Sequence, residues 1–434
     1  MSAHESPRSV IVVGAGIAGL ICAIELHRAG RSVVLLERAN DVGGRVRSTR
    51  LNDMVIDHGF QVLFTAYPTL GAYLDLDALS LRAFQPAARI VRDGRASLVG
   101  DAWRDPTLLL ETVFASSVSI GDKLRLLGLR RFAQQLSIDE CLATRFDRVS
   151  TREFLATRGF SSAVIDGFFA PFYGGILLDR TLSTSASVLL FTFKMLADGT
   201  TAVPARGMGA ITAQLAAQLP RGAVRIGVGV RHIDVADGRV CGVTLDDDSR
   251  FEAAQVVLAT EPLAAAALAE TAGVRIDVPV GAHACATVYY HTNRSPLPGK
   301  ALWLNADSDA VISHAVTLTD VAPEYAPVGT ALLAATAVGA AAALDDATLD
   351  SSARRDIARM AIAGGTSGGE LNRLAIWRVP YAQFSQPPGW RDHRPTIACG
   401  IPGLWRASEF LHSSSLEGAA RGGQSAARAL LQAT

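Results

Sequence analysis

Long hydrophobic runs are missing from this sequence, although 49% of its 434 residues are hydrophobic. No stretch of 18 consecutive apolar residues occurs, so we expect no transmembrane helix. The first nine residues, MSAHESPRS, are mostly polar and a strand-like apolar segment follows at once, so we expect no signal peptide. These features predict a globular, cytoplasmic protein with large buried cores.

Paired cysteines are also missing. The cysteines are odd in number, are scattered along the chain and form no C-x-x-C motif. Such a pattern is typical of small buried side chains in a reducing compartment, and it predicts neither a disulfide framework nor a metal site. The five cysteines are Cys22, Cys141, Cys241, Cys285 and Cys399.

The chain carries no excess of charge, because 41 Lys and Arg residues balance 41 Asp and Glu residues. This balance gives no indication of nucleic-acid binding. Lysine is scarce, since Lys123, Lys194 and Lys300 are the only lysines and every other basic residue is an arginine. Composition leaves the oligomeric state open.

Residues 10–37 predict a β-α-β unit. An apolar run at 10–13 predicts a buried strand, a helical pattern follows from residue 17, and Gly30 ends it. A second apolar strand at 33–36 leads into Glu37. The G-x-G-x-x-G spacing and a total length of about 30 residues are typical of a dinucleotide-binding fingerprint.

Each part of this unit has a chemical role. Gly14 permits the tight turn, Gly16 lets the backbone approach a pyrophosphate, and Gly19 lets the helix pack close to the strand. The helix N-terminus offers unpaired N–H groups to the phosphates. Glu37 can bind ribose hydroxyls and would repel a 2′-phosphate. The predicted binding residues here are Gly14, Ala15, Gly16, Ile17, Ala18, Gly19, Glu37 and Arg38.

The next residues distinguish FAD from NAD. Gly43, Gly44 and Arg45 follow Glu37 closely, and they resemble the G-G-R segment of the flavin amine oxidase and phytoene desaturase superfamily. In that family the glycines bring the backbone against the FAD pyrophosphate and the arginine helps to neutralise it. The resemblance therefore implies FAD as the cofactor, with these three residues in its site.

Two internal segments extend the resemblance. The segment DHGFQ, 57–61, lies where the superfamily borders the flavin, which implies contacts from Gly59, Phe60 and Gln61. His58 within it is either a base or a structural histidine in a turn. Residues 230–233 match a V-x-x-I pattern, which implies that Val230 offers its backbone to the adenine.

The end of the chain resembles the second flavin motif of the superfamily. A strand at 404–407 leads through an acid and a serine-rich loop into a helix at 417–432, whose N-terminus would stabilise reduced flavin. Ser408 departs from the glycine that most relatives carry. The resemblance implies contacts from Glu409, Leu416, Glu417 and Ala419. We expect non-covalent FAD, with His412 as the only candidate for attachment in this segment.

The middle of the chain is expected to form the substrate-binding part of the protein. Residues 167–196 are rich in aromatic and aliphatic side chains with few charges, and they predict either the helical wall of an apolar pocket or ordinary core. Residues 119–136 predict a helix that carries both apolar and basic side chains. This helix either presents a solvated basic face or makes peripheral contact with a membrane.

The resemblance implies an α/β fold in two domains. The first is a discontinuous, Rossmann-like (GR2-type) FAD-binding domain built from 1–75, 203–270 and 372–434. The second is an inserted, mixed α+β substrate domain built from 76–202 and 271–371.

The resemblance also implies an FAD-dependent oxidoreductase that transfers a hydride to flavin N5 from an apolar, isoprenoid-like or carotenoid-like, or amine substrate. The few charges in 167–196 favour the apolar substrate. Three rival functions stay open: a redox-neutral flavin isomerase, a protoporphyrinogen-type oxidase, and a non-catalytic flavin-binding scaffold. Lys300 is the candidate catalytic residue, because amine oxidases commonly hold a lysine near N5 through a water. A solvated lysine in the turn after Gly299 is the competing interpretation.

Overall fold

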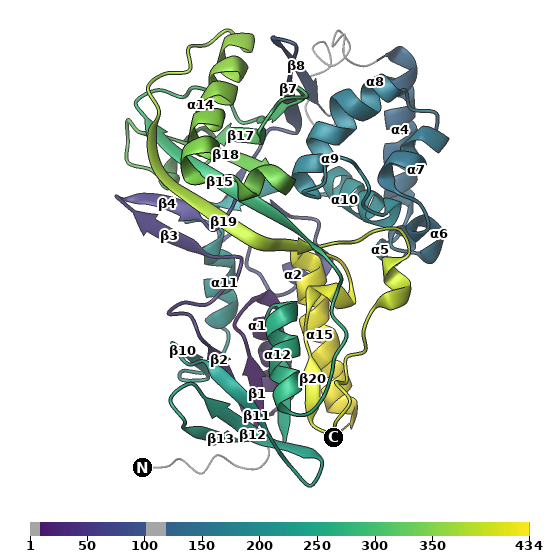
Figure 1. Cartoon of the computed structure of the whole chain (residues 1–434), viewed down its shortest axis with the longest axis vertical. Helices are drawn as coiled ribbons and strands as arrows, with labels where there is room; N and C mark the ends of the chain where they lie inside the picture. Colours follow the sequence, from purple (N-terminus) through teal and green to yellow (C-terminus); the bar gives the residue numbers. More distant parts are fainter. Residues whose placement is uncertain (1–8, 101–118, 434) are drawn as a thin grey trace.

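The computed structural model describes residues 9–100 and 119–433. Two large sheets lie one above the other, a parallel sheet at the bottom of Figure 1 and a mixed sheet at the top. A group of helices lies beside the upper sheet, on the right of Figure 1. The chain crosses between the two levels several times, so residues far apart in the sequence meet between them.

The lower sheet has five strands in the order β10-β2-β1-β14-β20, and all four pairings are parallel. The four residues of β1 are buried, and alternate ones point into different hydrophobic clusters, Val10 and Val12 on one face and Ile11 and Val13 on the other. This two-sided burial explains why the strand reads as a continuous apolar run. The strands are β1 Val10–Val13, β2 Val33–Glu37, β10 Val224–Ile226, β14 Gln255–Leu258 and β20 Leu404–Arg406.

Helices α1 (Ile17–Arg28) and α15 (Leu416–Ala433) pack against each other beside this sheet. Helix α1 ends where Gly30 takes a φ of +77°, the N–H of Gly30 bonds the carbonyl of His27, and the N–H of Arg31 bonds that of Leu26. This Schellman ending is one that glycine favours. Close packing of the two helices depends on Gly423, where an added Cβ would lie 2.3 Å from the carbonyl oxygen of Ala18.

Smaller elements surround the lower sheet. An antiparallel meander packs against helix α12, and two small antiparallel sheets link the lower and upper parts of the molecule. The strands on either side of this meander, β10 and β14, belong to the parallel sheet. These elements are β11 Val230–Ala236, β12 Arg239–Leu245, β13 Arg250–Glu252, α12 Pro262–Thr271, β3 Ser48–Leu51, β4 Met54–Asp57, β5 Leu63–Phe64, β6 Leu81–Ala83, β9 Thr201–Pro204, α2 Pro68–Gly71 and α11 Gly209–Ala216.

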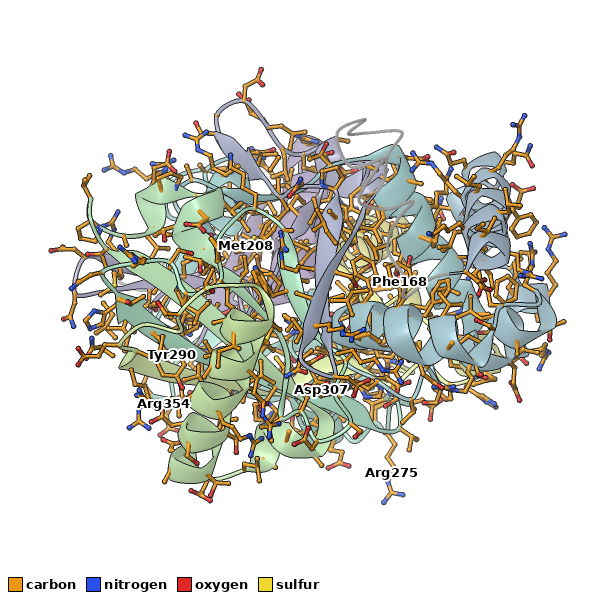
Figure 2. All side chains as sticks on the ribbon, turned by 90° about the horizontal axis from the view of Figure 1, so that it is seen from above. Phe168, Met208, Arg275, Tyr290, Asp307 and Arg354 are labelled. Carbon is orange, nitrogen blue, oxygen red and sulfur yellow. The ribbon has the colours of Figure 1, made fainter. Side chains whose placement is uncertain are left out.

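The upper sheet has seven strands in the order β19-β15-β18-β17-β16-β7-β8. Helix α14 (Asp346–Ala363) covers it, and Tyr290 of the sheet joins the two by donating to the carboxylate of Asp350 in α14. Arg354 of α14, close to Tyr290 in Figure 2, donates to the same carboxylate. The strands are β7 Ala87–Arg92, β8 Arg95–Gly100, β15 Ala282–Thr292, β16 Leu302–Asn305, β17 Ile312–Thr317, β18 Ala331–Val338 and β19 Asn372–Phe384, and the short helix α13 spans Leu318–Val321.

Strand β19 corrects one predicted boundary. We expected residues from 372 onward to belong with the cofactor segments, but β19 pairs with β15 along most of its length. The pairing runs from Ala282 with Phe384 to His291 with Asn372, with two register shifts, so β19 belongs to the upper sheet. The chain returns to the lower sheet only after Phe384.

The helical group follows the capping signals of its sequence. Ser150 and Glu153 form a capping box at the start of α7, with Ser150 accepting from the N–H of Glu153. Residues 167–196 form parts of a π-helical turn and of two helices, α9 and α10. The helices are α4 Ile120–Gln135, α5 Ile138–Cys141, α6 Thr144–Asp147, α7 Thr151–Thr157, α8 Ser162–Val164, the π-helical turn Ile165–Phe169, α9 Ala170–Ile176 and α10 Ala186–Asp198. Among the described residues, no helix combines the length and the apolar character that crossing a membrane requires.

Candidate functional site

A cavity of about 1850 Å³ extends from the carboxyl ends of β1 and β2 to the helical group. Typical ligand pockets hold roughly 300–1,000 Å³, so this cavity has room for more than one ligand. Its cofactor half is lined by residues within 13–61, 228–271 and 379–419. Its substrate half is lined by residues within 83–100, 123–201 and 285–314.

The turn after β1 is shaped for a phosphate group. Gly14 has a φ of +106°, and an added Cβ would lie 2.8 Å from the carbonyl oxygen of Ala259, so only glycine fits this turn. An added Cβ on Gly16 would meet nothing within 4 Å, and Gly16 lines the cavity. No side chain caps the N-terminus of α1. Uncapped N–H groups therefore face an open space, which fits a pyrophosphate.

Glu37 is held in place at the end of β2. One carboxylate oxygen accepts a hydrogen bond from the N–H of Ala15 at 2.8 Å, and the other accepts from the N–H of Ala39 at 2.9 Å. The side chain also lines the cavity, next to Arg38. An oriented carboxylate at this position fits a ribose and disfavours a 2′-phosphate.

Arg38 connects this region to Val230. Its guanidinium donates to the carbonyl of Val230 at 3.3 Å and lies 3.4 Å from the carboxylate of Asp246. Val230 lines the cavity. The two residues close the end of the cofactor half that is farthest from the helical group.

Arg45 and Glu409 join the G-G-R segment to the end of the chain. Both carboxylate oxygens of Glu409 accept from one guanidinium nitrogen of Arg45 at 2.6 Å, and a second nitrogen donates to the carbonyl of Ala382 at 3.0 Å. Burial alone would lower the pKa of Arg45, but the charge and hydrogen bond of Glu409 outweigh it and raise the pKa. Both side chains of this ion pair line the cavity.

The segment Gly59–Gln61 forms the wall between the two halves. The amide of Gln61 donates to the carbonyl of Arg45 at 2.6 Å, and the N–H of Phe60 donates to the hydroxyl of Thr287 in β15 at 3.2 Å. All three residues of the segment line the cavity. The segment is therefore fixed to the cofactor half on one side and to the upper sheet on the other.

Ser408 replaces the expected glycine without strain. Its backbone is extended, with φ −155° and ψ 155°, a conformation that any residue adopts. Helix α15 approaches the backbone of Ser408 closely at Gly422, where an added Cβ would lie 2.1 Å from the carbonyl oxygen of Ser408. The departure from the family pattern therefore leaves the wall of the cavity intact.

The substrate half is apolar. The π-helical turn Ile165–Phe169 and helix α9 supply stacked aromatic rings, Phe168 and Phe172, with ring centroids 5.7 Å apart. Figure 2 shows Phe168 where the helices meet the strands. Among its described lining residues there is no Asp or Glu, whereas Lys123 and Arg130 of α4 supply positive charge. This confirms that 167–196 form a wall of an apolar pocket.

Comparison with known proteins decides the family. Residues 17–431 match the family of flavin containing amine oxidoreductases, which is nearly the whole chain. The protein belongs to this family. The predicted superfamily and its flavin cofactor, FAD, are thereby confirmed.

The curated relatives of this chain are named for different substrates. Protoporphyrinogen oxidase 2 of Arabidopsis thaliana is 32% identical over 174 residues, which is 39% of this chain and 32% of that protein. An L-amino-acid oxidase of Crotalus adamanteus is 31% identical over 166 residues, 37% of this chain and 32% of that protein. The matches thus span about a third of the length of these curated relatives.

A solved structure shares the fold along the whole chain. It comes from Exiguobacterium sp. 255-15 and is provisionally described as a protoporphyrinogen oxidase. The TM-score is 0.76 at 18% identity, and the superposition covers 99% of this chain and 100% of that chain. At this identity the likeness shows the mixed α/β flavoenzyme fold and nothing about the substrate.

Most of the predicted cofactor residues line the cavity, and some do not. Ala15 and Gly19 lie outside the lining. Ala15 orients Glu37, and Gly19 serves packing, because an added Cβ there would lie 1.9 Å from the carbonyl oxygen of Gly14. The predicted residues on the lining are Gly14, Gly16, Ile17, Ala18, Glu37, Arg38, Gly43, Gly44, Arg45, Gly59, Phe60, Gln61, Val230, Glu409, Leu416 and Ala419.

The structure corrects the prediction that Glu417 contacts the cofactor. It is 1% exposed and lies outside the lining, and its carboxylate accepts from the N–H groups of Thr69 at 3.1 Å and Leu70 at 3.0 Å. Burial raises its pKa. The side chain therefore caps α2 and fixes α15 to it, although its neighbours Leu416 and Ala419 do line the cavity.

The structure also corrects the prediction that Lys300 is a catalytic residue. It is exposed in a turn, outside the cavity lining, and its carbonyl accepts from the N–H of Gln85 at 3.0 Å. A turn after Pro298-Gly299 directs the side chain to solvent, which agrees with the interpretation of Lys300 as a solvated turn residue. The lysine on the cavity wall is Lys123, which sequence reasoning treated only as part of a basic helix.

Two histidines are held by neighbouring side chains. His58 stacks on Trp377 with ring centroids 3.6 Å apart, and its ring nitrogens contact Thr49 at 2.8 Å and Arg47 at 3.2 Å. Burial and then the charge of Arg47 lower its pKa to about 4, as expected of a structural histidine. His412 bonds Ser425 at 3.1 Å and lies outside the lining.

Proposed function

We propose that this protein is an FAD-dependent oxidoreductase whose substrate is apolar and carries no positive charge where it meets the cofactor. The observation that carries this is the substrate half of the cavity, which has no carboxylate among its described residues. An ammonium group moved from water into such a site, with no anion to pair with, is strongly disfavoured. Phe168 and Phe172 lie parallel, with an interplanar angle of 7°, and contact each other rather than facing across a gap. They therefore form no aromatic cage for an amine.

We infer a Rossmann-like, GR2-type cofactor domain from the parallel sheet and the residues at its carboxyl edge. The uncapped start of α1 and Gly16 would hold the pyrophosphate, and Glu37 the ribose. Arg45 would balance phosphate charge, and Glu409 would accept from ribityl hydroxyls. When bound, FAD supplies the two-electron oxidation, and the protein supplies binding, orientation and exclusion of water.

The test is reduction of the bound flavin in the absence of oxygen. The purified holoenzyme is mixed with a panel of polyenes, isoprenoids and primary amines, and the loss of flavin absorbance is recorded. We expect an apolar compound to bleach the flavin and cationic amines to leave it oxidised. Bleaching by amines alone would contradict the proposal.

A flavin isomerase and a flavin-binding scaffold would each behave differently in the same experiment. A redox-neutral isomerase would convert its substrate only after the flavin has been reduced chemically, with no net consumption of oxidant. A non-catalytic scaffold would show neither bleaching nor conversion with any member of the panel.

A protoporphyrinogen-type oxidase is a second candidate, favoured by the cations on the cavity wall. Lys123 and Arg130 could pair with the carboxylates at the rim of a tetrapyrrole, while its apolar face packs on the helical wall. The Arabidopsis thaliana relative bears that name. Adding protoporphyrinogen to the panel tests this candidate, and Lys123→Met together with Arg130→Met should then raise KM for it more than for a neutral isoprenoid.

We also propose that α4 brings the cavity mouth to a membrane surface. Ile120, Leu124 and Leu127 are 78%, 65% and 44% exposed and share one face of α4. Lys123 and Arg131 lie on the same helix, which suits anionic lipid headgroups. An apolar substrate dissolved in lipid could then reach Leu127, which lies both on this face and on the cavity lining.

A further inference from the structure

His314 is a buried polar side chain without a partner, on the wall of the substrate half. It lies in β17, is 3% exposed and lines the cavity. Its Nδ1 is shielded from solvent and has no hydrogen-bond partner, and no described residue bonds its Nε2. Buried polar groups are nearly always hydrogen-bonded, so an unpaired imidazole beside a cavity needs an explanation.

The ring is held in place by what surrounds it. Phe60 lies on one side, with ring centroids 5.2 Å apart. An added Cβ on Gly175 of α9 would lie 2.9 Å from Nδ1, so glycine at 175 leaves the space that the imidazole fills. Because Phe60 belongs to the segment between the two halves, His314 lies next to the cofactor half.

Arg180 sets the charge around the ring. Its guanidinium donates to the carbonyls of Asn305, Asp307 and Ala310, and it makes no hydrogen bond to the imidazole. Burial, and then the charge of Arg180, lower the pKa of His314 to about 4. The imidazole is therefore neutral at physiological pH, with one N–H and one lone pair.

The position of Nδ1 selects the tautomer. Nδ1 faces the Cα of Gly175, where no acceptor lies, so a proton there would leave a donor buried and unpaired. A lone pair at Nδ1 can instead contact a Cα–H group. The proton then belongs on Nε2, which makes His314 a donor that requires a partner in the cavity.

We propose that His314 is the specificity-determining residue of the substrate half, and that it donates one hydrogen bond to a neutral oxygen of an otherwise apolar substrate. The oxygen belongs to a carbonyl or a hydroxyl group, and the bond places this end of the substrate beside Phe60. The proposal rests on the proposed function for the identity of the site, and it deepens that function by naming the polar group of the substrate. A protonated amine has no lone pair to accept the bond, so the ammonium form gains nothing from His314.

A matched pair of probes tests the proposal. Farnesol and farnesene share the isoprenoid chain and differ in the oxygen. Their Kd values for the oxidised holoenzyme are measured from the change in flavin absorbance. We expect wild type to bind farnesol about 10-fold more tightly than farnesene, as one well-made buried hydrogen bond provides. His314→Phe should reduce this ratio to within about 2-fold.

Three further variants keep the test decisive. His314→Gln retains an N–H donor and should keep part of the preference for farnesol. Gly175→Ala keeps His314 in the sequence, but the added Cβ would push its imidazole ring aside. This variant should therefore also lower the preference for farnesol over farnesene. His291→Phe is the matched control, since His291 lies in β15 outside the lining, and it should behave as wild type. Flavin content and the melting temperature report on folding.

Two results would overturn the proposal. One is a wild type that does not distinguish the two probes, and the other is an unchanged preference in a His314→Phe protein that retains its flavin. Failure of the proposed function looks different. In that case no apolar compound bleaches the flavin, whereas the Kd ratio and its dependence on His314 can still be measured.

Discussion

At the scale of single residues, the chemistry depends on carboxylates that the backbone orients. Glu37 and Glu417 are both predicted cofactor ligands, yet both accept hydrogen bonds from main-chain N–H groups. Glu37 does so at the cavity surface and Glu417 beneath it. The same bond type therefore prepares a ligand site in one case and caps a helix in the other, and only exposure to the cavity separates the two.

Replacing Glu37 should weaken FAD binding and leave the fold intact. Glu37→Ala removes charge-assisted hydrogen bonds, each worth about 1.5–3 kcal/mol, so we expect FAD affinity to fall on the order of 10-fold to 100-fold. Titration of the apoprotein with FAD, followed by flavin fluorescence, measures the change. Asp41→Ala is the control, because Asp41 is an exposed acid outside the lining. Equal affinity in wild type and Glu37→Ala would show that the carboxylate does not contact the cofactor.

We expect FAD to be bound without a covalent link. His412 bonds Ser425 and lies outside the lining. Cys285 lines the cavity, but burial raises the pKa of its thiol to about 11, so the nucleophilic thiolate is scarce. Acid precipitation should release all yellow colour into the supernatant. Flavin that stays in the pellet and is lost in Cys285→Ser would identify a thioether link.

At the scale of elements, contact between α1 and α15 fixes the cofactor edge. Gly423→Ala should destabilise the protein, because its Cβ would lie 2.3 Å from the carbonyl oxygen of Ala18. Overpacking of this kind costs about 1–3 kcal/mol. Gly128→Ala in α4 is the matched control, since its Cβ would meet nothing within 4 Å. That change should be neutral or stabilise the helix by up to about 1 kcal/mol. Urea unfolding that ranks the two variants the other way would reject the packing role of Gly423.

Helix α4 should govern membrane contact. Changing Ile120, Leu124 and Leu127 together to Ser removes the exposed apolar face. We expect this variant no longer to rise with anionic vesicles in a flotation assay. Flavin content should stay unchanged in this triple variant. Vesicles of neutral lipid should bind wild type more weakly, because Lys123 and Arg131 attract anionic headgroups. A wild type that floats with neither vesicle type would remove this part of the proposal.

At the scale of the whole molecule, the sequence predicted the cofactor half better than the substrate half. The β-α-β unit, the G-G-R segment and the closing motif are local patterns, and each has a physical reason that glycine and acid spacing make visible. His314, Gly175 and Lys123 line the cavity from three separate elements. No local pattern marks them, since their meeting depends on how the upper sheet faces the helices. The assignment of Lys300 failed for the same reason, because sequence alone could not say which lysine faces inward.

Buried histidines should make the stability of the whole molecule depend on pH. The pKa values of His58, His314 and His412 all fall from 6.5 to about 4, chiefly by burial. A depressed folded-state pKa stabilises the folded protein above pH 6.5, and this stabilisation is lost as the pH falls towards 4. Burial raises the pKa of Asp57 and Glu417, which opposes the trend, so wild type must be compared with a variant.

His412→Gln isolates one contribution, because glutamine can still bond Ser425 and does not titrate. We expect the free energy of unfolding, measured in urea from pH 7.5 to 4.5, to fall less steeply in this variant than in wild type. His393→Gln is the control for replacing a histidine by glutamine, since His393 is exposed nearby. Parallel curves for His412→Gln and wild type would mean that His412 accepts a proton as easily in the folded protein as in the unfolded chain.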